Sequence, residues 1–346
     1  MSGKILQHVF MLVNFFMCFV LTNCEFQERL MRKLLGERTI YVDPWSQLQQ
    51  YYSCFTTIQA AIDSVPSNNK QWVLISIKAG IYNEQVVIPQ NKSFIYLKGE
   101  GMGKTNVVWG AHEYMLSSST FGSLADNIVV SGMTFVNSYN YPPNETENPV
   151  KPAVAAMISG DKSAFYECSF LGYQDTLLDD QGRHYFKRCK IEGSTDFIFG
   201  SGQSIYEQCV ISVNGGVADP DSIGYIAANA RSSENDSSGF VFKRCNVTGA
   251  GTTYLGRAWK AYSRVIYSNS FLSDIVIPQG WDAWDFVGQE NRLTFAEYGC
   301  NGSGSDKSNR VEWEKNLSLT EFLSFTSNAY IDTDGWIQKL PLDVLD

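Results

Sequence analysis

The sequence predicts an all-β protein, a right-handed parallel β-helix with short capping helices, and two observations carry this prediction. An aromatic-rich phrase with a cysteine near its end recurs at residues 165–170, 185–191 and 206–211. The cysteines of these phrases, Cys168, Cys189 and Cys209, lie 21 and 20 residues apart. A repeat of about 20 residues made of short β-rich runs is typical of a solenoid in which each repeat forms one coil. Leucine-rich repeats share this period, but their leucine and asparagine ladder is absent, which favours a parallel β-helix.

Looser copies of the phrase extend the stack, at residues 130–135, 242–247 and 267–271. Their intervals are stretched to 35, 36 and 24 residues, which leaves room for loops between coils. Short helices are expected at the two ends. Residues 56–59 form a capping-box pattern followed by apolar residues at helical spacing until Pro66. A second short helix is expected to begin at Thr320 and to end near Phe325.

The N-terminal segment has the pattern of a secretory signal peptide. It carries Lys4, then a mostly apolar run over residues 9–21 that is too short for a transmembrane helix, and no further charge before Glu25. We therefore expect a signal peptide over 1–24, a short leader over 25–40 and one β-helix domain over 41–346. Loss of Lys4 changes the formal net charge from -9 to -10. Such an acidic protein is repelled by nucleic acid and by polyanionic polymers.

Six cysteines fall outside the expected signal peptide, namely Cys54, Cys168, Cys189, Cys209, Cys245 and Cys300. In an oxidising compartment an even number of cysteines can form disulfides, whose connectivity the sequence does not show. The alternative is a ladder of buried thiols along the stack. Six glycosylation sequons also favour secretion, at Asn91, Asn144, Asn235, Asn246, Asn301 and Asn316.

Two aspartates occupy corresponding positions in successive repeats. Asp175 and Asp196 are 21 residues apart, and neighbouring strands of a sheet lie about 4.8 Å apart, so we expect the two to be vertical neighbours. Two carboxylates so close cannot both ionise cheaply, and the pair supplies a proton donor beside an anionic base or nucleophile. Solvated turn formers are the alternative for such a pair. The apolar residues 197–199 favour a functional site, because they desolvate the carboxylate.

Five segments in the same order make the chain resemble the plant pectin methylesterase (pectinesterase) family, in the type that lacks an N-terminal inhibitor-like pro-region. They are Gly-Ile-Tyr-Asn-Glu at 80–84, Pro-Ala-Val-Ala-Ala at 152–156, Gly-Tyr-Gln-Asp-Thr-Leu at 172–177, Asp-Phe-Ile-Phe-Gly at 196–200 and Leu-Gly-Arg-Ala-Trp at 255–259. The resemblance runs from about Tyr41 to the C-terminus. Two positions depart from the family pattern, because Pro152 replaces a glutamine and Ala258 replaces a proline.

This resemblance implies a secreted carboxylic ester hydrolase that removes methyl esters from homogalacturonan in the cell wall and releases methanol. It implies that Asp196 attacks the ester carbonyl or activates water to do so. Asp175 would protonate the departing methanol and then act as the base for water. Arg257 would hold Asp196 ionised and aimed, and Gln174 would donate an N–H group to the developing oxyanion.

The resemblance also implies the remaining contacts of the site. Trp259 and Trp281 are expected to form an aromatic floor for sugar rings, while Tyr82 and Glu84 hold the fold near the cleft. No cofactor and no metal are expected. The expected partners are methyl-esterified pectin and a proteinaceous inhibitor, with no nucleic acid and no membrane, and the protein is expected to be a monomer.

Other functions are weighed against this one. The sequence has no Gly-X-Ser-X-Gly elbow and no cluster at metal-ligand spacing, which disfavours a serine esterase or a metalloenzyme. Other pectin-acting β-helix enzymes, the lyases and polygalacturonases, would cleave the chain without releasing methanol. A secreted wall-binding pseudoenzyme with weak or no turnover is the alternative from a different class, because Pro152 has no hydrogen-bond donor.

Overall fold

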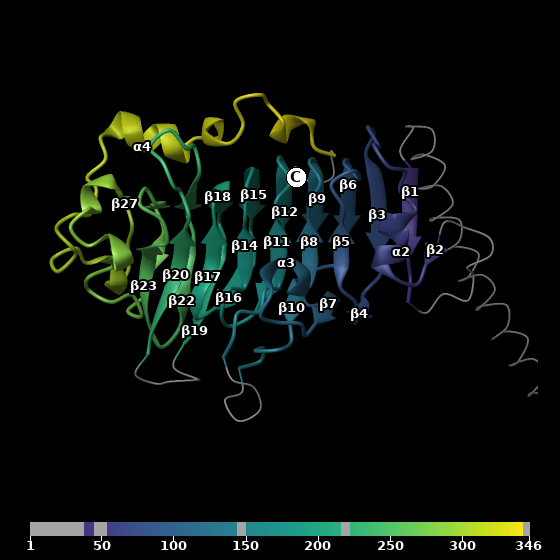
Figure 1. Cartoon of the computed structure of the whole chain (residues 1–346), viewed down its shortest axis with the longest axis horizontal. Helices are drawn as coiled ribbons and strands as arrows, with labels where there is room; N and C mark the ends of the chain where they lie inside the picture. Colours follow the sequence, from purple (N-terminus) through teal and green to yellow (C-terminus); the bar gives the residue numbers. More distant parts are fainter. Residues whose placement is uncertain (1–37, 45–53, 144–149, 216–221, 342–346) are drawn as a thin grey trace, which may run out of the picture.

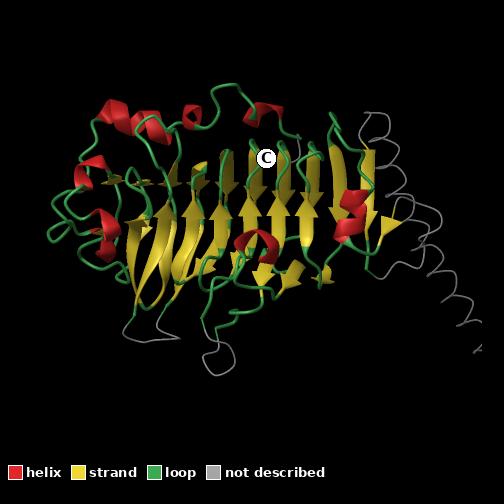
Figure 2. Ribbon diagram, viewed as in Figure 1, coloured by secondary structure: helices red, strands yellow, loops and turns green. Residues whose placement is uncertain are grey.

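The computed structural model describes residues 38–44, 54–143, 150–215 and 222–341, which form one parallel β-helix (Figures 1 and 2). The expected signal peptide lies outside the described residues, as does the sequon at Asn144. The expected leader ends too late, because its last three residues already belong to strand β1 (Arg38–Val42), which pairs in parallel with β3 (Val73–Ile77). Within the described residues, no helix has the length and apolar character needed to span a membrane.

Three parallel sheets run along the stack, and each complete coil contributes one strand to each of them. Sheet A has 11 described strands, in the order β2 (Cys54–Phe55), β1, β3, β6 (Ile95–Lys98), β9 (Ile128–Ser131), β12 (Ser163–Tyr166), β15 (Arg183–Lys187), β18 (Gln203–Glu207), β21 (Gly239–Lys243), β24 (Arg264–Ser268) and β27 (Thr294–Tyr298). Sheet B has 8 described strands, in the order β25 (Phe271–Leu272), β22 (Asn246–Ala250), β19 (Val210–Asn214), β16 (Lys190–Gly193), β13 (Ser169–Leu171), β10 (Thr134–Asn137), β7 (Thr105–Trp109) and β4 (Gly80–Tyr82). Sheet C also has 8 described strands, in the order β26 (Trp281–Asp282), β23 (Thr252–Ala258), β20 (Ile223–Asn229), β17 (Thr195–Gly200), β14 (Leu177–Asp179), β11 (Ala156–Ile158), β8 (Phe121–Ser123) and β5 (Val86–Ile88).

The recurring aromatic phrase fills the interior of the stack. Phe165, Phe186, Tyr206, Phe242 and Tyr267 occupy one register position on successive strands of sheet A. Their rings stack with centroids 4.5–5.0 Å apart, and all five side chains are fully buried. The repeat in the sequence is therefore the return of one core position per coil, as the solenoid prediction requires.

The buried cysteines form a ladder of free thiols beside this aromatic stack. Cys168, Cys189, Cys209 and Cys245 each donate to a backbone carbonyl of the preceding coil at 3.2–3.6 Å. The residue before each of them has a positive φ of 51–56°, so the same tight corner joins sheets A and B in each of these coils. The cysteines in the described part of the chain are free. Of the two alternatives left open by the sequence, the structure forms the ladder.

A short helix covers the first coils. Helix α2 (Ile58–Asp63) has Thr57 as its N-cap, one residue later than the expected capping box. Gln59 does not complete that box, because its side chain bonds both backbone groups of Val87, at 2.7 and 3.1 Å. The carboxylate of Glu84 instead accepts the first N–H groups of α2 at 2.8 and 3.0 Å. Glu84 is thus a helix cap, in line with the structural role expected for it.

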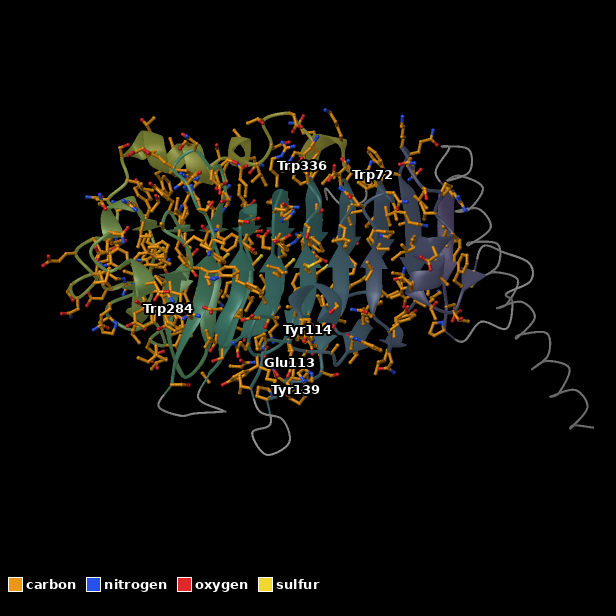
Figure 3. The ribbon with its side chains drawn as sticks, in the orientation of Figure 1. Trp72, Glu113, Tyr114, Tyr139, Trp284 and Trp336 are labelled. Carbon is orange, nitrogen blue, oxygen red and sulfur yellow. The ribbon has the colours of Figure 1, made fainter. Side chains whose placement is uncertain are left out.

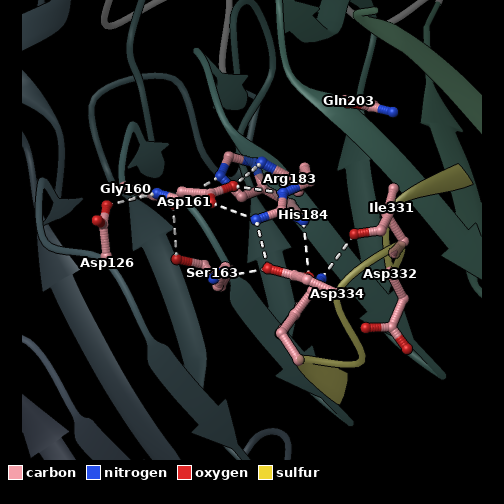
Figure 4. Close-up of polar contacts among 12 residues, drawn as sticks. Asp126, Gly160, Asp161, Ser163, Arg183, His184, Gln203, Ile331, Asp332 and Asp334 are labelled. Carbon is pink, nitrogen blue, oxygen red and sulfur yellow. Dashed lines mark hydrogen bonds and ion pairs between the residues drawn. The ribbon is translucent and has the colours of Figure 1, made fainter. Parts of the chain in front are cut away.

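The C-terminal segment packs along the outer face of sheet A (Figure 1). It contains α4 (Leu319–Thr326), which begins one residue before the expected start and has a complete capping box. Asp334 anchors the segment through an ion pair with Arg183 at 2.9 Å, and Arg183 also binds Asp161 (Figure 4). The remaining short helices are α3 (Met115–Ser118), η1 (Trp284–Phe286), η2 (Glu290–Arg292), η3 (Ser303–Ser305), η4 (Asn328–Tyr330) and η5 (Ile337–Lys339).

Candidate active site

Asp175 and Asp196 lie at the same level on adjacent coils. Gln174 bridges to Thr195, and the next strand pair keeps the same register, so the two aspartates stand opposite each other. The N–H group of Asp175 donates to the carbonyl of Thr195 at 3.1 Å. Both aspartates have a positive φ, of 60° and 47°, a region that aspartate tolerates better than most residues. Such backbone strain is frequent at functional sites.

A β-bulge in β17 aims the carboxylate of Asp196. Strands β17 and β20 pair on both sides of this residue, but their register shifts by one residue between Thr195 and Ile198. Bulges bend a strand and re-aim the side chain at the extra residue. Gly193 keeps the space beside the bulge clear, because a Cβ there would lie 2.3 Å from the Cβ of Phe197. The glycine before the second aspartate motif is therefore a packing requirement of the site.

The two carboxyl groups differ in their electrostatic surroundings. Burial and, after it, the nearby Asp196 carboxylate raise the pKa of Asp175, whereas the Arg257 guanidinium lowers it. The net result is a pKa of about 7. Burial also raises the pKa of Asp196, which is 9% exposed, but Arg257 opposes that rise through hydrogen bonds and charge. Near neutral pH, Asp175 can therefore hold a proton while Asp196 stays ionised on its guanidinium partner.

Arg257 binds Asp196 with two nitrogen atoms. Its Nε donates to Oδ1 at 2.7 Å, and one terminal nitrogen donates to Oδ2. The guanidinium carbon also lies 3.7 Å from the ring centroid of Trp284 and 4.6 Å from that of Tyr225. The resemblance to the family implied that Arg257 pairs with Asp196, and the structure forms this pair as a bidentate contact. The two aromatic partners of Arg257 were not predicted.

The structure separates the three tryptophans of this region. Trp259 is 39% exposed and its ring tilts against Phe199 at 5.9 Å, so it can contact a ligand. The prediction for Trp281 is wrong, because this side chain is 1% exposed and stacks on Phe295 in the core at 4.9 Å. Trp284, which is 44% exposed (Figure 3), takes its place beside the site. Its signal in the sequence was its position three residues after Trp281. Side chains alternate between the two faces of a strand, so residues an odd number of positions apart point in opposite directions.

Pro152 lies on the coil that precedes Gln174. The N–H group of the next residue, Ala153, donates to the carbonyl of Gln174 at 3.2 Å. Gln174 is partly exposed and directly precedes Asp175, as a donor to a reacting ester requires. The side chain of Lys151, the other candidate donor at this position, forms an ion pair with Glu113. Glu113 also lies 3.8 Å from His112.

This arrangement supplies an acid and an anion on adjacent coils, with a cation that fixes the anion. No group of three or more His, Cys, Asp or Glu side chains that could hold a metal ion occurs in the described ranges. Carboxyl groups in this arrangement can transfer protons and act as nucleophiles.

Comparison with known proteins places the chain. Residues 49–334 match the family model described as Pectinesterase. The chain belongs to the pectinesterase family. It is 51% identical over 308 residues to the probable pectinesterase 29 of Arabidopsis thaliana, across 88% of this chain and 90% of that protein. It is 53% identical over 298 residues to the probable pectinesterase 55 of the same plant, across 86% of this chain and 90% of that protein.

Solved structures agree with this assignment. The pectin methylesterase from carrot matches with a TM-score of 0.77 and 27% identity, across 89% of this chain and 97% of that one. The predicted family and the predicted right-handed parallel β-helix are confirmed. The prediction of a carboxylic ester hydrolase is confirmed at the level of the pectinesterase family.

Proposed function

We propose that this pectinesterase-family protein hydrolyses the methyl esters of homogalacturonan in the cell wall and that Asp175 and Asp196 perform the reaction. One observation carries the proposal. A carboxyl group with a pKa of about 7 lies on the coil next to a carboxylate held by a bidentate guanidinium. A general acid works best when its pKa is near the pH of use, and a nucleophile must be ionised and aimed.

In the first half of the reaction, an oxygen of the Asp196 carboxylate attacks the ester carbonyl carbon. The carbonyl oxygen becomes an oxyanion, to which the Gln174 amide donates a hydrogen bond. When the carbon–methoxy bond breaks, the protonated carboxyl of Asp175 gives its proton to the leaving oxygen, and methanol departs. The acyl carbon of the uronic acid unit is then joined to Asp196 as a mixed anhydride.

In the second half, water releases the acyl group. Asp175, now ionised, takes a proton from a water molecule while the water oxygen attacks the acyl carbon. The bond to Asp196 breaks, Arg257 receives the restored carboxylate, and Asp175 is again protonated. The products are one methanol and one free carboxyl group on the polymer. The new negative charges are unfavourable beside an acidic protein with a formal net charge of -9, which favours heavily esterified pectin as the substrate.

Two exposed tryptophans support polymer binding on this face. Trp259 and Trp284 are 39% and 44% exposed, and both follow the catalytic arginine, Arg257, in the chain. We include in the proposal secretion to the wall, a monomeric state and an inhibitor protein as a further partner. Pro152 favours the alternative of a pseudoenzyme. Gln174, which is retained as a donor to the oxyanion, favours an active enzyme instead.

The test is a methanol-release assay on highly esterified pectin with the purified mature protein, with polymer length followed in parallel. We expect methanol to appear while the chain length stays constant. Chain cleavage without methanol would support a lyase or a polygalacturonase. Pectin binding with no methanol from a folded protein would support the wall-binding pseudoenzyme.

A further inference from the structure

Asp282, the last residue of β26, holds two aromatic residues at once. Its Oδ2 accepts a hydrogen bond from the hydroxyl of Tyr225 at 2.9 Å. Its Oδ1 accepts the backbone N–H group of Trp284 at 2.8 Å. Tyr225 comes from β20, and Trp284 opens η1. One carboxylate therefore fixes two elements whose side chains both reach Arg257.

The two aromatic side chains form a corner around the catalytic arginine. Their rings are nearly perpendicular, at 85°, with centroids 6.2 Å apart. The guanidinium carbon of Arg257 lies over both rings, at 3.7 Å from the Trp284 centroid and 4.6 Å from the Tyr225 centroid. A cation over an aromatic face is attracted by the ring quadrupole. This aromatic corner of Tyr225 and Trp284 therefore limits where the guanidinium can lie.

The corner depends on a strained residue. Trp284 has a φ of 51°, a left-handed conformation that is unusual for a bulky side chain. Such strain persists only where surrounding contacts impose it. The bond from the Trp284 N–H group back to the side chain two residues earlier is that of an Asx turn, which stabilises this kind of local reversal. Asp282 supplies that contact, so it decides which way the Trp284 ring points.

We propose that Asp282 is a positioning residue for Arg257, and through Arg257 for the carboxylate of Asp196. The inference rests on the proposed function and adds a residue that has no part in the proton transfers. The groups that face Asp196 are Asp175 on the preceding coil and Arg257 on β23. Without Asp282, the aromatic corner loosens and the guanidinium leaves its bidentate geometry for part of the time. Asp196 is then less stabilised in its ionised form.

The test compares four variants with the wild type. Asp282→Ala removes both contacts, Asp282→Asn keeps an acceptor for the Trp284 N–H group, and Tyr225→Phe keeps the ring but removes its hydroxyl. The matched control is Asp285→Ala, which removes an equally charged but exposed side chain from η1. Methanol release is measured across pH for kcat and KM separately, with circular dichroism and thermal unfolding as checks of the fold.

We expect Asp282→Ala to lower kcat about tenfold, because misplacing a catalytic group by an ångström costs up to about 100-fold. KM should change less than kcat, and the acidic limb of the kcat/KM profile should move to higher pH. Asp282→Asn and Tyr225→Phe should each give a smaller loss, and Asp285→Ala none. A folded Asp282→Ala protein with wild-type kcat and an unmoved acidic limb would overturn the proposal.

A second measurement is independent of turnover. The Nε–Hε group of Arg257, which donates to Asp196, gives an NMR signal that reports its hydrogen bond and its exchange with water. We expect this signal to shift and to exchange faster in Asp282→Ala than in Asp285→Ala. If the wild type releases no methanol, the proposed function fails, and this comparison still decides the positioning role. Identical Arg257 signals in the two variants would refute that role.

Discussion

Asp175 and Asp179 lie in the same coil, four residues apart, and the protein uses them in opposite ways. Asp179 is fully buried, and its carboxylate accepts hydrogen bonds from Nδ1 of His184 at 2.5 Å and from the Tyr206 hydroxyl at 2.6 Å. Asp175 is only partly buried and faces the carboxylate of Asp196. Burial and, after it, the charge of Asp196 raise the pKa of Asp175 to about 7. Burial by itself therefore does not make a carboxyl group reactive, because the neighbouring groups decide.

The Asp179 network is closed, whereas the Asp175 site is open. The second ring nitrogen of His184 lies 2.9 Å from the carbonyl of Gly160, which can only accept, so that nitrogen carries a proton. Both ring nitrogens of His184 and both carboxylate oxygens of Asp179 have a hydrogen-bond partner inside the core. At Asp175 the charged group with the larger effect, the Asp196 carboxylate, has the same sign. A group with an unfavourable neighbour is the one that can exchange a proton with a substrate.

The largest expected effect is the loss of activity when either aspartate of the open site, Asp175 or Asp196, is changed. Asp175→Asn and Asp196→Asn should each lower methanol release by about 100-fold to 10,000-fold, because each removes one half of the acid and base pair. Both proteins should keep the wild-type circular dichroism spectrum. Near wild-type activity in either variant would remove the assigned roles.

The second prediction concerns stability and the closed network of Asp179. Asp179→Ala should lower the free energy of unfolding by about 2–6 kcal/mol, since it leaves the buried His184 ring nitrogen and the Tyr206 hydroxyl without their partner, at about 1–3 kcal/mol for each group. The measurement is urea unfolding at neutral pH, with Asp285→Ala as the control for loss of an exposed carboxylate. Turnover per folded molecule should stay close to wild type. A selective loss of kcat with unchanged stability would show that the two regions are coupled in catalysis.

The third prediction uses pH. Because Asp175 must be protonated to act as an acid, kcat/KM should fall as pH rises above about 7. The same pKa, raised from an ordinary value of 3.8, also links this group to stability. Its contribution is fully present below the unfolded pKa and is lost as pH rises through the folded pKa.

The control for the pH effect is Asp175→Asn, which has no such proton to lose. Its urea midpoint should rise relative to wild type as pH increases from about 4 to about 7. A difference that stays constant over this interval would show that Asp175 does not titrate near neutral pH.

The smallest expected effect concerns the oxyanion. Pro152→Gln should raise kcat by roughly tenfold, less than the 100-fold to 1000-fold typical of one oxyanion donor, because Gln174 is already in place. Lys151 is engaged with Glu113, so Lys151→Ala should leave kcat nearly unchanged. A sharp loss in Lys151→Ala with no gain in Pro152→Gln would mean that the lysine serves as the second donor. No change in either variant would mean that one donor is enough.

Much of this protein could be predicted from the sequence because a β-helix repeats its contacts. Residues about 20 positions apart become neighbours on adjacent coils, so the spacing of Asp175 and Asp196 in the chain already states that they meet. The same rule predicted that the aromatic phrase returns once per coil. It left a ladder of thiols and a set of disulfides as alternatives, between which the structure decided. The role of Arg257 rested on resemblance alone, since it lies 61 residues from Asp196 and inserted loops hide the register.

Only the tertiary structure decided which similar residues differ in function. Trp281 and Trp284 look alike in the sequence, yet a two-residue strand turns the first into the core and an Asx turn at Asp282 brings the second onto Arg257. His184, one of two histidines after the expected signal peptide, proved to be a core partner of Asp179. The physical reason is that the pKa and the role of a buried group depend on which donors and charges surround it in space. Those neighbours come from other coils and from loops of irregular length, which the local sequence does not encode.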